Sequence, residues 1–137
     1  KKENEKGLND FSTYSDFASK IEKIKEEFTK FLEKANKENK SVICYGAPAK
    51  GNTLLNYFKI NPKLIEYTVD LSPHKQGLFL PGTHIAIKKP SQIKETRPDY
   101  IIILPWNLKD EIMEQMKEVK DWGGKFVIPI PEVHIVS

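Results

Sequence analysis

Residues 41–57 read SVICYGAPAKGNTLLNY, and their hydrophobic period changes within a few positions. Residues 42–45 form a short apolar run with the length and the β-branched and aromatic composition of a strand. Gly46 ends this run. Pro48 suits the first position of a helix, where its missing N–H would have no partner, and apolar residues recur at helical spacing over 54–58. The pattern predicts a strand, a tight turn and a helix.

The predicted turn lies where α/β folds bind anions, but it departs from both common phosphate motifs. Free N–H groups and the helix dipole favour an anion at such a turn. Gly46 and Gly51 fit the first and third glycines of G-x-G-x-x-G, whereas Pro48 occupies the middle position that the pyrophosphate approaches. Against the P-loop pattern, Thr53 fits the hydroxyl position and Asn52 replaces the lysine. Two interpretations stay open: a turn that needs glycine for its geometry, and a ligand-binding turn.

Charge and composition exclude several classes of protein. The chain has 137 residues, a typical length for one domain, with 22 basic and 19 acidic residues and a formal net charge of +3. This mixed surface is not typical of a nucleic-acid binder. The single cysteine, Cys44, excludes an internal disulfide and favours a reducing compartment. No membrane-spanning stretch or signal peptide is recognisable, so we expect a cytoplasmic protein without a nucleic-acid or membrane partner.

The amino-terminal region divides into a polar lead and one long helix. Residues 1–12 are predicted to be a linker or disordered lead, and the domain is expected to span 13–137. The chain starts at Lys1 rather than at a methionine, so we expect either a processed chain or a piece of a longer protein. Thr13 or Ser15 is expected to cap a helix with an apolar stripe at steps of three and four residues, formed by Phe17, Ile21, Ile24, Phe28, Leu32 and Ala35. This helix is predicted to cover one face of a sheet.

The rest of the chain alternates between strand and helix patterns. Residues 100–104, YIIIL, are continuously apolar and predict a central parallel strand buried on both faces. Asn107 is expected to cap the following helix. Further strands are predicted at 64–69, 83–87, 126–128 and 133–136, and further helices at 90–96 and 108–119. The order predicts a three-layer, Rossmann-like α/β domain with a mostly parallel sheet, helices on both faces and the 42–45 strand near its centre.

Unusual residues gather after the predicted strands, and the carboxyl ends of parallel strands share one edge of a sheet. Asp70 ends the second strand at about the distance from Gly46 at which dinucleotide folds place a ribose-binding carboxylate. An Asx turn is the alternative interpretation of Asp70. Lys50 and Gly51 are expected to neighbour a phosphate. The crevice is predicted to be substrate-binding and to involve Gly46, Ala47, Pro48, Lys50, Gly51, Asn52, Thr53, Asp70, His74, Lys75, Trp106 and Asn107.

No catalytic residue and no metal ligand is predicted in this chain. One cysteine within an apolar run and three scattered histidines lack the spacing of a metal site. The sequence also lacks a nucleophile elbow with a base partner, which excludes the common hydrolase chemistry.

Six blocks of the sequence, from about Phe17 to the end, resemble a known family. They are YGAPAKGNTLLN at 45–56, VD at 69–70, PHKQG at 73–77, LPGTH at 80–84, LPWN at 104–107 and PIPE at 129–132. Together and in this order they resemble the C-terminal domain of S-adenosylmethionine-dependent sugar C-methyltransferases.

The resemblance implies a Rossmann-like domain preceded by a zinc-binding cysteine module and a central domain that holds S-adenosylmethionine. Such enzymes methylate a carbon next to a keto group of a nucleotide-linked deoxysugar. The implied role is an accessory, substrate-facing domain that shares the nucleotide sugar with the upstream methyltransferase domain. It would carry neither zinc nor S-adenosylmethionine and would be inactive alone. The alternatives are a free-standing nucleotide-binding or regulatory module without methyl transfer, and a purely structural or dimerising domain.

Overall fold

The structure, a computed structural model, describes residues 2–129 and 133–136, with side chains described from residue 19 onward. Its elements follow in the order α1 (Lys2–Lys37), β1 (Val42–Tyr45), α2 (Ala49–Tyr57), η1 (Pro62–Leu64), β2 (Thr68–Val69), β3 (Ile87–Lys88), α3 (Gln92–Thr96), β4 (Tyr100–Ile103), η2 (Trp106–Leu108), α4 (Lys109–Gln115), η3 (Lys117–Trp122), β5 (Lys125–Ile128) and β6 (His134–Val136), where η denotes a 3-10 helix.

The described strands form one six-stranded sheet in the order β3-β2-β1-β4-β5-β6. The neighbouring strands β3, β2, β1, β4 and β5 all pair in parallel. Strand β6 pairs antiparallel with β5 at one edge of the sheet. In β1, Cys44 lies opposite Thr68 on one side and Ile102 on the other. The predicted Rossmann-like α/β class and the central position of the first strand are therefore confirmed.

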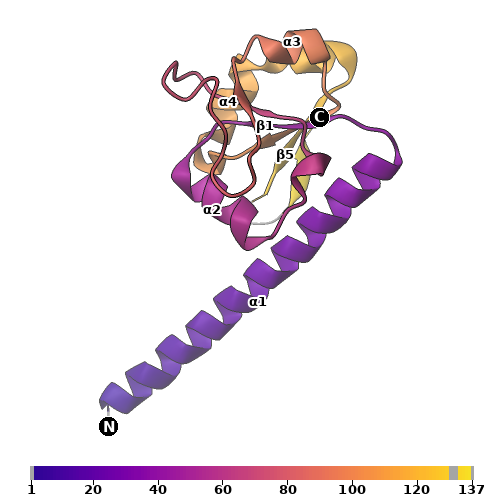
Figure 1. Cartoon of the computed structure of the whole chain (residues 1–137). Coiled ribbons are helices and arrows are strands. Elements are labelled where there is room, and N and C mark those ends of the chain that lie inside the picture. Colours follow the sequence, from indigo (N-terminus) through magenta and orange to yellow (C-terminus); the bar gives the residue numbers. More distant parts are fainter. Residues whose placement is uncertain (1, 130–132, 137) are drawn as a thin grey trace.

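Alternation along the central strands separates two hydrophobic cores. Val42 and Cys44 pack into a cluster with residues of α1 and α2, whereas Ile43 and Tyr45 pack into a second cluster with residues of α3, α4 and η3. Figure 1 shows α1 and α2 on one side of the sheet and α3 and α4 on the other. A strand that is apolar at every position suits this arrangement, because successive side chains point to opposite faces and both faces are covered.

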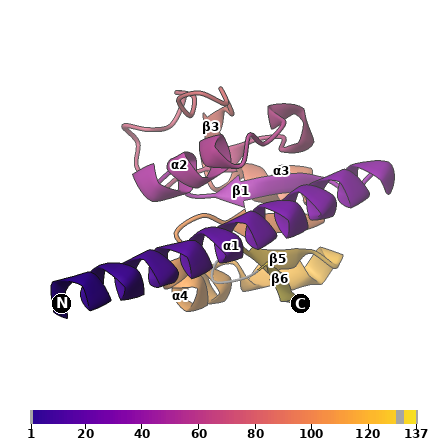
Figure 2. The same cartoon turned by 90° about the horizontal axis from the view of Figure 1, so that it is seen from below.

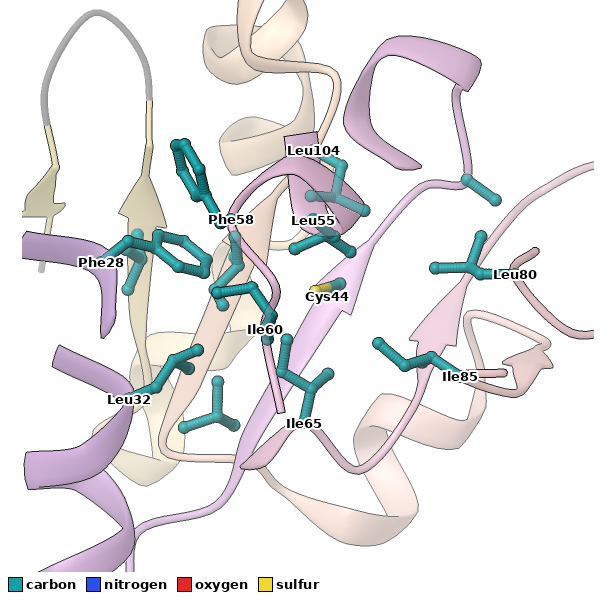
Figure 3. Packing of buried hydrophobic residues seen from close by; sticks show 14 of the residues in the cluster. Phe28, Leu32, Cys44, Leu55, Phe58, Ile60, Ile65, Leu80, Ile85 and Leu104 are labelled. Atoms are coloured by element: carbon teal, nitrogen blue, oxygen red, sulfur yellow. The ribbon is translucent and has the colours of Figure 1, made fainter. Parts of the chain in front are cut away.

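Helix α1 joins the domain through its carboxyl-terminal half. Its buried side chains are Ile24, Phe28, Leu32 and Ala35. Phe28 is fully buried and its ring centroid lies 5.9 Å from that of Phe58 (Figure 3). Seen from below, α1 runs across the sheet (Figure 2). This part of the predicted apolar stripe is confirmed, while the side chain of Phe17 lies outside the described residues.

The start of α1 differs from the prediction. The helix begins at Lys2, so residues predicted as a disordered lead are helical, and neither Thr13 nor Ser15 is a cap. The glutamates and lysines of this region are good helix formers. A polar composition therefore does not exclude a helix; it indicates only that the helix has no apolar face to bury. The amino-terminal part of α1 runs past the body of the domain (Figure 1). The predicted boundary of the domain at 13 stays a prediction.

Two strands are shorter than predicted. The predicted strand at 64–69 is reduced to β2, because the side-chain oxygen of Asn61 accepts the N–H of Lys63 and the chain first forms η1. The predicted strand at 83–87 is reduced to β3, because His84 has a left-handed φ of +61° that interrupts an extended chain.

The predicted helix at 108–119 is divided into α4 and η3. Asn107 does not cap it, so this prediction was wrong. Leu108 is the N-cap residue, and its N–H donates to the carbonyl oxygen of Pro105 at 2.9 Å within η2. The intervening 3-10 turn therefore shifts the start of α4 and frees the Asn107 side chain for another contact. Gly123, with a φ of +79°, is the residue at which η3 ends.

Cys44 is expected to resist alkylation in the folded protein. Its side chain is fully buried, and burial raises the pKa of the thiol because a thiolate is poorly solvated there. Thiolate is therefore scarce at pH 8, well below the raised pKa. Reaction with a colorimetric disulfide reagent should be slow in buffer and fast in 6 M guanidinium, where the denatured control reports the one thiol of the chain. Rapid labelling under native conditions would show that the β1 core opens readily.

Candidate functional site

A pocket of about 340 Å³ opens at the carboxyl edge of the sheet. Strand β1 continues through α2 to β2 on one side, and β4 continues through α4 to β5 on the other, so the pocket lies where the strand order reverses. Open α/β sheets bind ligands at this position. The pocket is lined by Tyr45, Gly46, Ala47, Pro48, Asp70, Leu71, Lys75, Pro105, Leu108, Glu111, Ile112 and Gln115.

The glycine turn lines the pocket and is held by neighbouring side chains. Gly46 has a φ of +92°, and its carbonyl oxygen accepts a hydrogen bond from the buried Thr68 hydroxyl at 2.6 Å. The N–H of Ala47 donates to Asp70 Oδ2 at 2.9 Å. The Asp70 carboxylate thus takes the place that a bound anion would have at the N–H of Ala47. The next residue, Pro48, has no N–H to donate.

Asp70 connects this turn to the loop after β2. Its Oδ1 accepts the N–H of Ser72 at 2.8 Å, which is the predicted Asx turn. Lys75 Nζ lies 4.0 Å from Asp70 Oδ2 and donates to the Ala47 carbonyl oxygen at 3.1 Å. A carboxylate offers about four lone-pair sites, so these contacts leave acceptor capacity for a ligand. The ribose-binding role of Asp70 stays a prediction.

Tyr45 supplies a further polar group at the pocket. Burial, and in second place the nearby charge of Asp70, raise the pKa of this phenol. The hydroxyl group therefore keeps its proton at neutral pH and is available as a hydrogen-bond donor.

Residues that the sequence analysis missed form the apolar and helical walls. Leu71 and Leu108 line the pocket although their side chains are 65% and 44% exposed. Glu111 and Gln115 line it from α4, four residues apart. A signal was present, because Leu108, Glu111 and Gln115 follow at steps of three and four directly after a strand end.

Three predicted residues meet beside the pocket without lining it. Lys50 Nζ donates to Asn107 Oδ1 at 2.6 Å and lies 4.7 Å from the centroid of a Trp106 ring. These contacts join the start of α2 to η2 and restrain an otherwise exposed lysine. Of the predicted site, Gly46, Ala47, Pro48, Asp70 and Lys75 line the pocket itself.

The other predicted residues have structural surroundings. Gly51 is buried, and a Cβ there would lie 2.9 Å from Leu104 Cβ, so its role in the structure is close packing of α2 on the sheet. The Thr53 hydroxyl donates to the Ala49 carbonyl oxygen within α2.

Asn52 and His74 also lie away from the pocket lining. Asn52 Oδ1 accepts from Asn56 Nδ2 at 3.3 Å. His74 is exposed in the turn after β2. The block PIPE at 129–132 is described only at Pro129, and its remainder lies outside the described residues.

The family described as the C-methyltransferase C-terminal domain matches residues 1–131. This chain belongs to that family. A relative from Streptomyces niveus, C-methyltransferase NovU, is 35% identical over 135 residues, which are 98% of this chain and 32% of NovU. This C-methyltransferase C-terminal domain therefore spans about a third of the length of that relative.

The fold is similar to that of a solved structure, UDP-D-quinovosamine 4-dehydrogenase from Vibrio fischeri. The two share 19% sequence identity with a TM-score of 0.50, over 72% of this C-methyltransferase C-terminal domain and 93% of the dehydrogenase chain. At this identity the likeness concerns the fold alone, and it agrees with the Rossmann-like class.

The described residues contain neither a membrane-spanning helix nor a cluster of metal ligands. None of its described helices is long and apolar enough to cross a membrane. Within the same residues, no group of three or more His, Cys, Asp or Glu side chains is placed to hold a metal ion.

Proposed function

We propose that this domain is the accessory, substrate-facing part of a C-methyltransferase that acts on a nucleotide-linked keto-deoxysugar. The observation that carries the proposal is the pocket at the switch point, where carboxylate, amine, amide and phenol groups stand among apolar side chains. Such a mixture suits a ligand with both hydroxyl groups and a ring face. The name of the relative NovU supports the reaction class.

We propose that this pocket does not hold S-adenosylmethionine as a resident cofactor. A donor site in a Rossmann-like fold needs an open glycine turn with amides free for the ligand. Here Asp70 takes the amide of Ala47, and Pro48 has no amide hydrogen. The lone thiol of Cys44 is buried within the sheet, so this chain also offers no cysteine cluster for zinc. We therefore place the methyl donor and the zinc in other parts of the longer protein.

The substrate is proposed to be shared between this domain and the methyltransferase domain. Small ligands are normally held by burying most of their surface, and here Leu71 and Leu108 stay 65% and 44% exposed. A second domain that closes over the ligand would complete the site. Proton removal next to the keto group requires a base within hydrogen-bond reach of that carbon. We assign that base to the methyltransferase domain.

The isolated chain is expected to show no methyl transfer and no tight binding of S-adenosylmethionine. Calorimetric titration with S-adenosylmethionine should give no measurable heat of binding. A thymidine-diphosphate keto-deoxysugar should bind weakly, because only part of the site is present. A full-length member of the family is the positive control for both ligands. Micromolar or tighter binding of S-adenosylmethionine by this chain would make it a methyltransferase domain in its own right.

A further inference from the structure

We infer that the methyltransferase domain of the longer protein docks on one flank of this domain, which is formed by the outer side of α2 and the hairpin 77–87. The exposed residues of this uncharged flank are Asn56, Tyr57, Leu78, Phe79, Pro81 and His84. None of them lines the pocket. The inference rests on the proposed function and specifies where the two domains meet.

The uncharged flank lacks the charges that cover the rest of the surface. Asp, Glu, Lys and Arg make up 30% of the chain, yet none of them occurs at 51–58 or at 76–87. The other long stretches without charge contain the buried strands β1 and β4. Burial does not explain the hairpin in the same way, because Leu78 and Phe79 are 56% and 60% exposed. Depletion of charge together with aromatic side chains is typical of the centre of a protein interface.

Hydrogen bonds hold the hairpin and α2 together as one surface. The carbonyl oxygen of Leu78 accepts the N–H of Ile87 at 2.8 Å across the hairpin. From α2, Asn56 Nδ2 donates to the Pro81 carbonyl oxygen at 3.1 Å, and a Cβ at Gly82 would overlap with the Asn56 side chain. The exposed side chains therefore stand on a fixed backbone, so little conformational entropy is lost when a partner covers them.

Half of the large apolar side chains that are exposed in the described part of the chain lie on the uncharged flank. They are Tyr57, Leu78 and Phe79. The others are Leu71 and Leu108 at the pocket and Ile135 on β6. Single exposed apolar side chains are ordinary, whereas several on one surface mark a place of contact with another protein surface.

The size of the uncharged flank favours a tethered partner over a separate molecule. Its six exposed side chains are fewer than the roughly 20–30 residues that each side of a stable interface between separate proteins contributes. A domain of the same polypeptide needs less contact, because a short linker keeps its effective concentration roughly millimolar. The relative NovU has room for such a domain, since this chain matches 32% of its length.

Helix α1 leads to the same side of the domain. In Figures 1 and 2 the amino-terminal part of α1 projects beyond the body of the domain at the end where α2 lies. An upstream domain joined to α1 in the longer protein would therefore begin on the α2 side. It would reach the uncharged flank without crossing the sheet.

Hydrogen–deuterium exchange read by mass spectrometry tests this docking in the full-length protein that contains these residues, compared with the 137-residue chain. We expect amides at 56–58 and 78–84 to exchange at least about tenfold more slowly in the full-length protein, because docking shields them from solvent. Amides of α3, which packs on the other face of the sheet, should exchange equally in both. Sedimentation of the isolated chain should give the mass of one copy, 15.8 kDa.

Matched substitutions add a second measurement. Phe79→Asp places a charge on the uncharged flank and should return exchange at 56–58 and 80–84 in the full-length protein to the rate of the isolated chain. Ile135→Asp is the control, because Ile135 is 47% exposed at the opposite edge of the sheet, and it should leave the protection unchanged. Tyr57→Glu makes the same test from α2. Amide NMR spectra of the isolated chain with each substitution verify that the variants fold.

The outcomes separate this inference from the proposed function. Equal exchange at these amides in the full-length protein and the isolated chain would overturn the docking, while methyl transfer by the full-length protein would leave the proposed function standing. Protection that survives both Phe79→Asp and Tyr57→Glu would also overturn the docking. So would a dimeric isolated chain in which the uncharged flank is already protected. A full-length protein without a methyltransferase domain would overturn both.

Discussion

Replacing Phe28 by alanine is expected to lower the free energy of unfolding by about 3–5 kcal/mol, the usual range for a buried phenylalanine. The Phe28 side chain is fully buried in the core on the α1 face of the sheet and packs against Phe58 at 5.9 Å between ring centroids. Its removal leaves a cavity between α1 and α2. Among single substitutions in α1, this one tests most directly whether the helix is part of the domain.

Urea denaturation followed by circular dichroism measures this effect. Lys30→Ala on the exposed side of α1 is the control, because it changes a neighbouring residue without altering the core. We expect Lys30→Ala to change stability by less than about 0.5 kcal/mol, as surface substitutions usually do. A loss below about 1 kcal/mol for Phe28→Ala would fall outside the range for a buried aromatic residue. It would mean that α1 is not docked on the sheet.

Replacing Gly46 by alanine is expected to cost about 2–5 kcal/mol, from two sources that add. A side chain at a left-handed φ costs roughly 1–2 kcal/mol. A Cβ at Gly46 would also lie 2.8 Å from the Cδ of Pro105, and such crowding typically costs about 1–3 kcal/mol. Both residues line the pocket, so relief of this overlap would also alter the candidate site.

Gly77→Ala separates the two sources. Gly77 has a φ of +86°, close to that of Gly46, but an added Cβ would meet no atom within 4 Å. It should therefore cost only the backbone strain of roughly 1–2 kcal/mol. Thermal unfolding of both variants under the same conditions gives the comparison. Equal destabilisation would show that the approach of Pro105 to the glycine turn contributes nothing.

Asp70 shows how far sequence spacing leads toward the candidate site. Its distance from Gly46 along the chain predicted that it would stand at the carboxyl edge, and it does. The spacing did not predict that its carboxylate would bond to the amide of Ala47 and so fill the glycine turn from within. That hydrogen bond joins Ala47, which follows β1, to Asp70, which follows β2. It therefore depends on the pairing of β1 with β2.

Gly51 and Lys50 illustrate the same limit. Both were expected near a phosphate because they belong to the turn. In the structure a Cβ at Gly51 would meet Leu104, and Lys50 contacts Trp106 and Asn107. Their place beside a phosphate stays a prediction. The direction in which a helical residue points is decided by how the helix packs on the sheet, which a motif of the turn alone does not contain.

By itself, the sequence determined the α/β class, the central strands β1 and β4, and the edge at which special residues gather. These properties follow from the hydrophobic period and from the order of the elements along the chain. Both can be read locally, without knowing how the elements pack. Only the tertiary structure decided that α4 supplies Glu111 and Gln115 to the pocket and that Asp70 occupies the turn. Such pairings join groups far apart in the chain. Their geometry is set by how the strands pair and how the helices dock, not by the spacing of residues in the sequence.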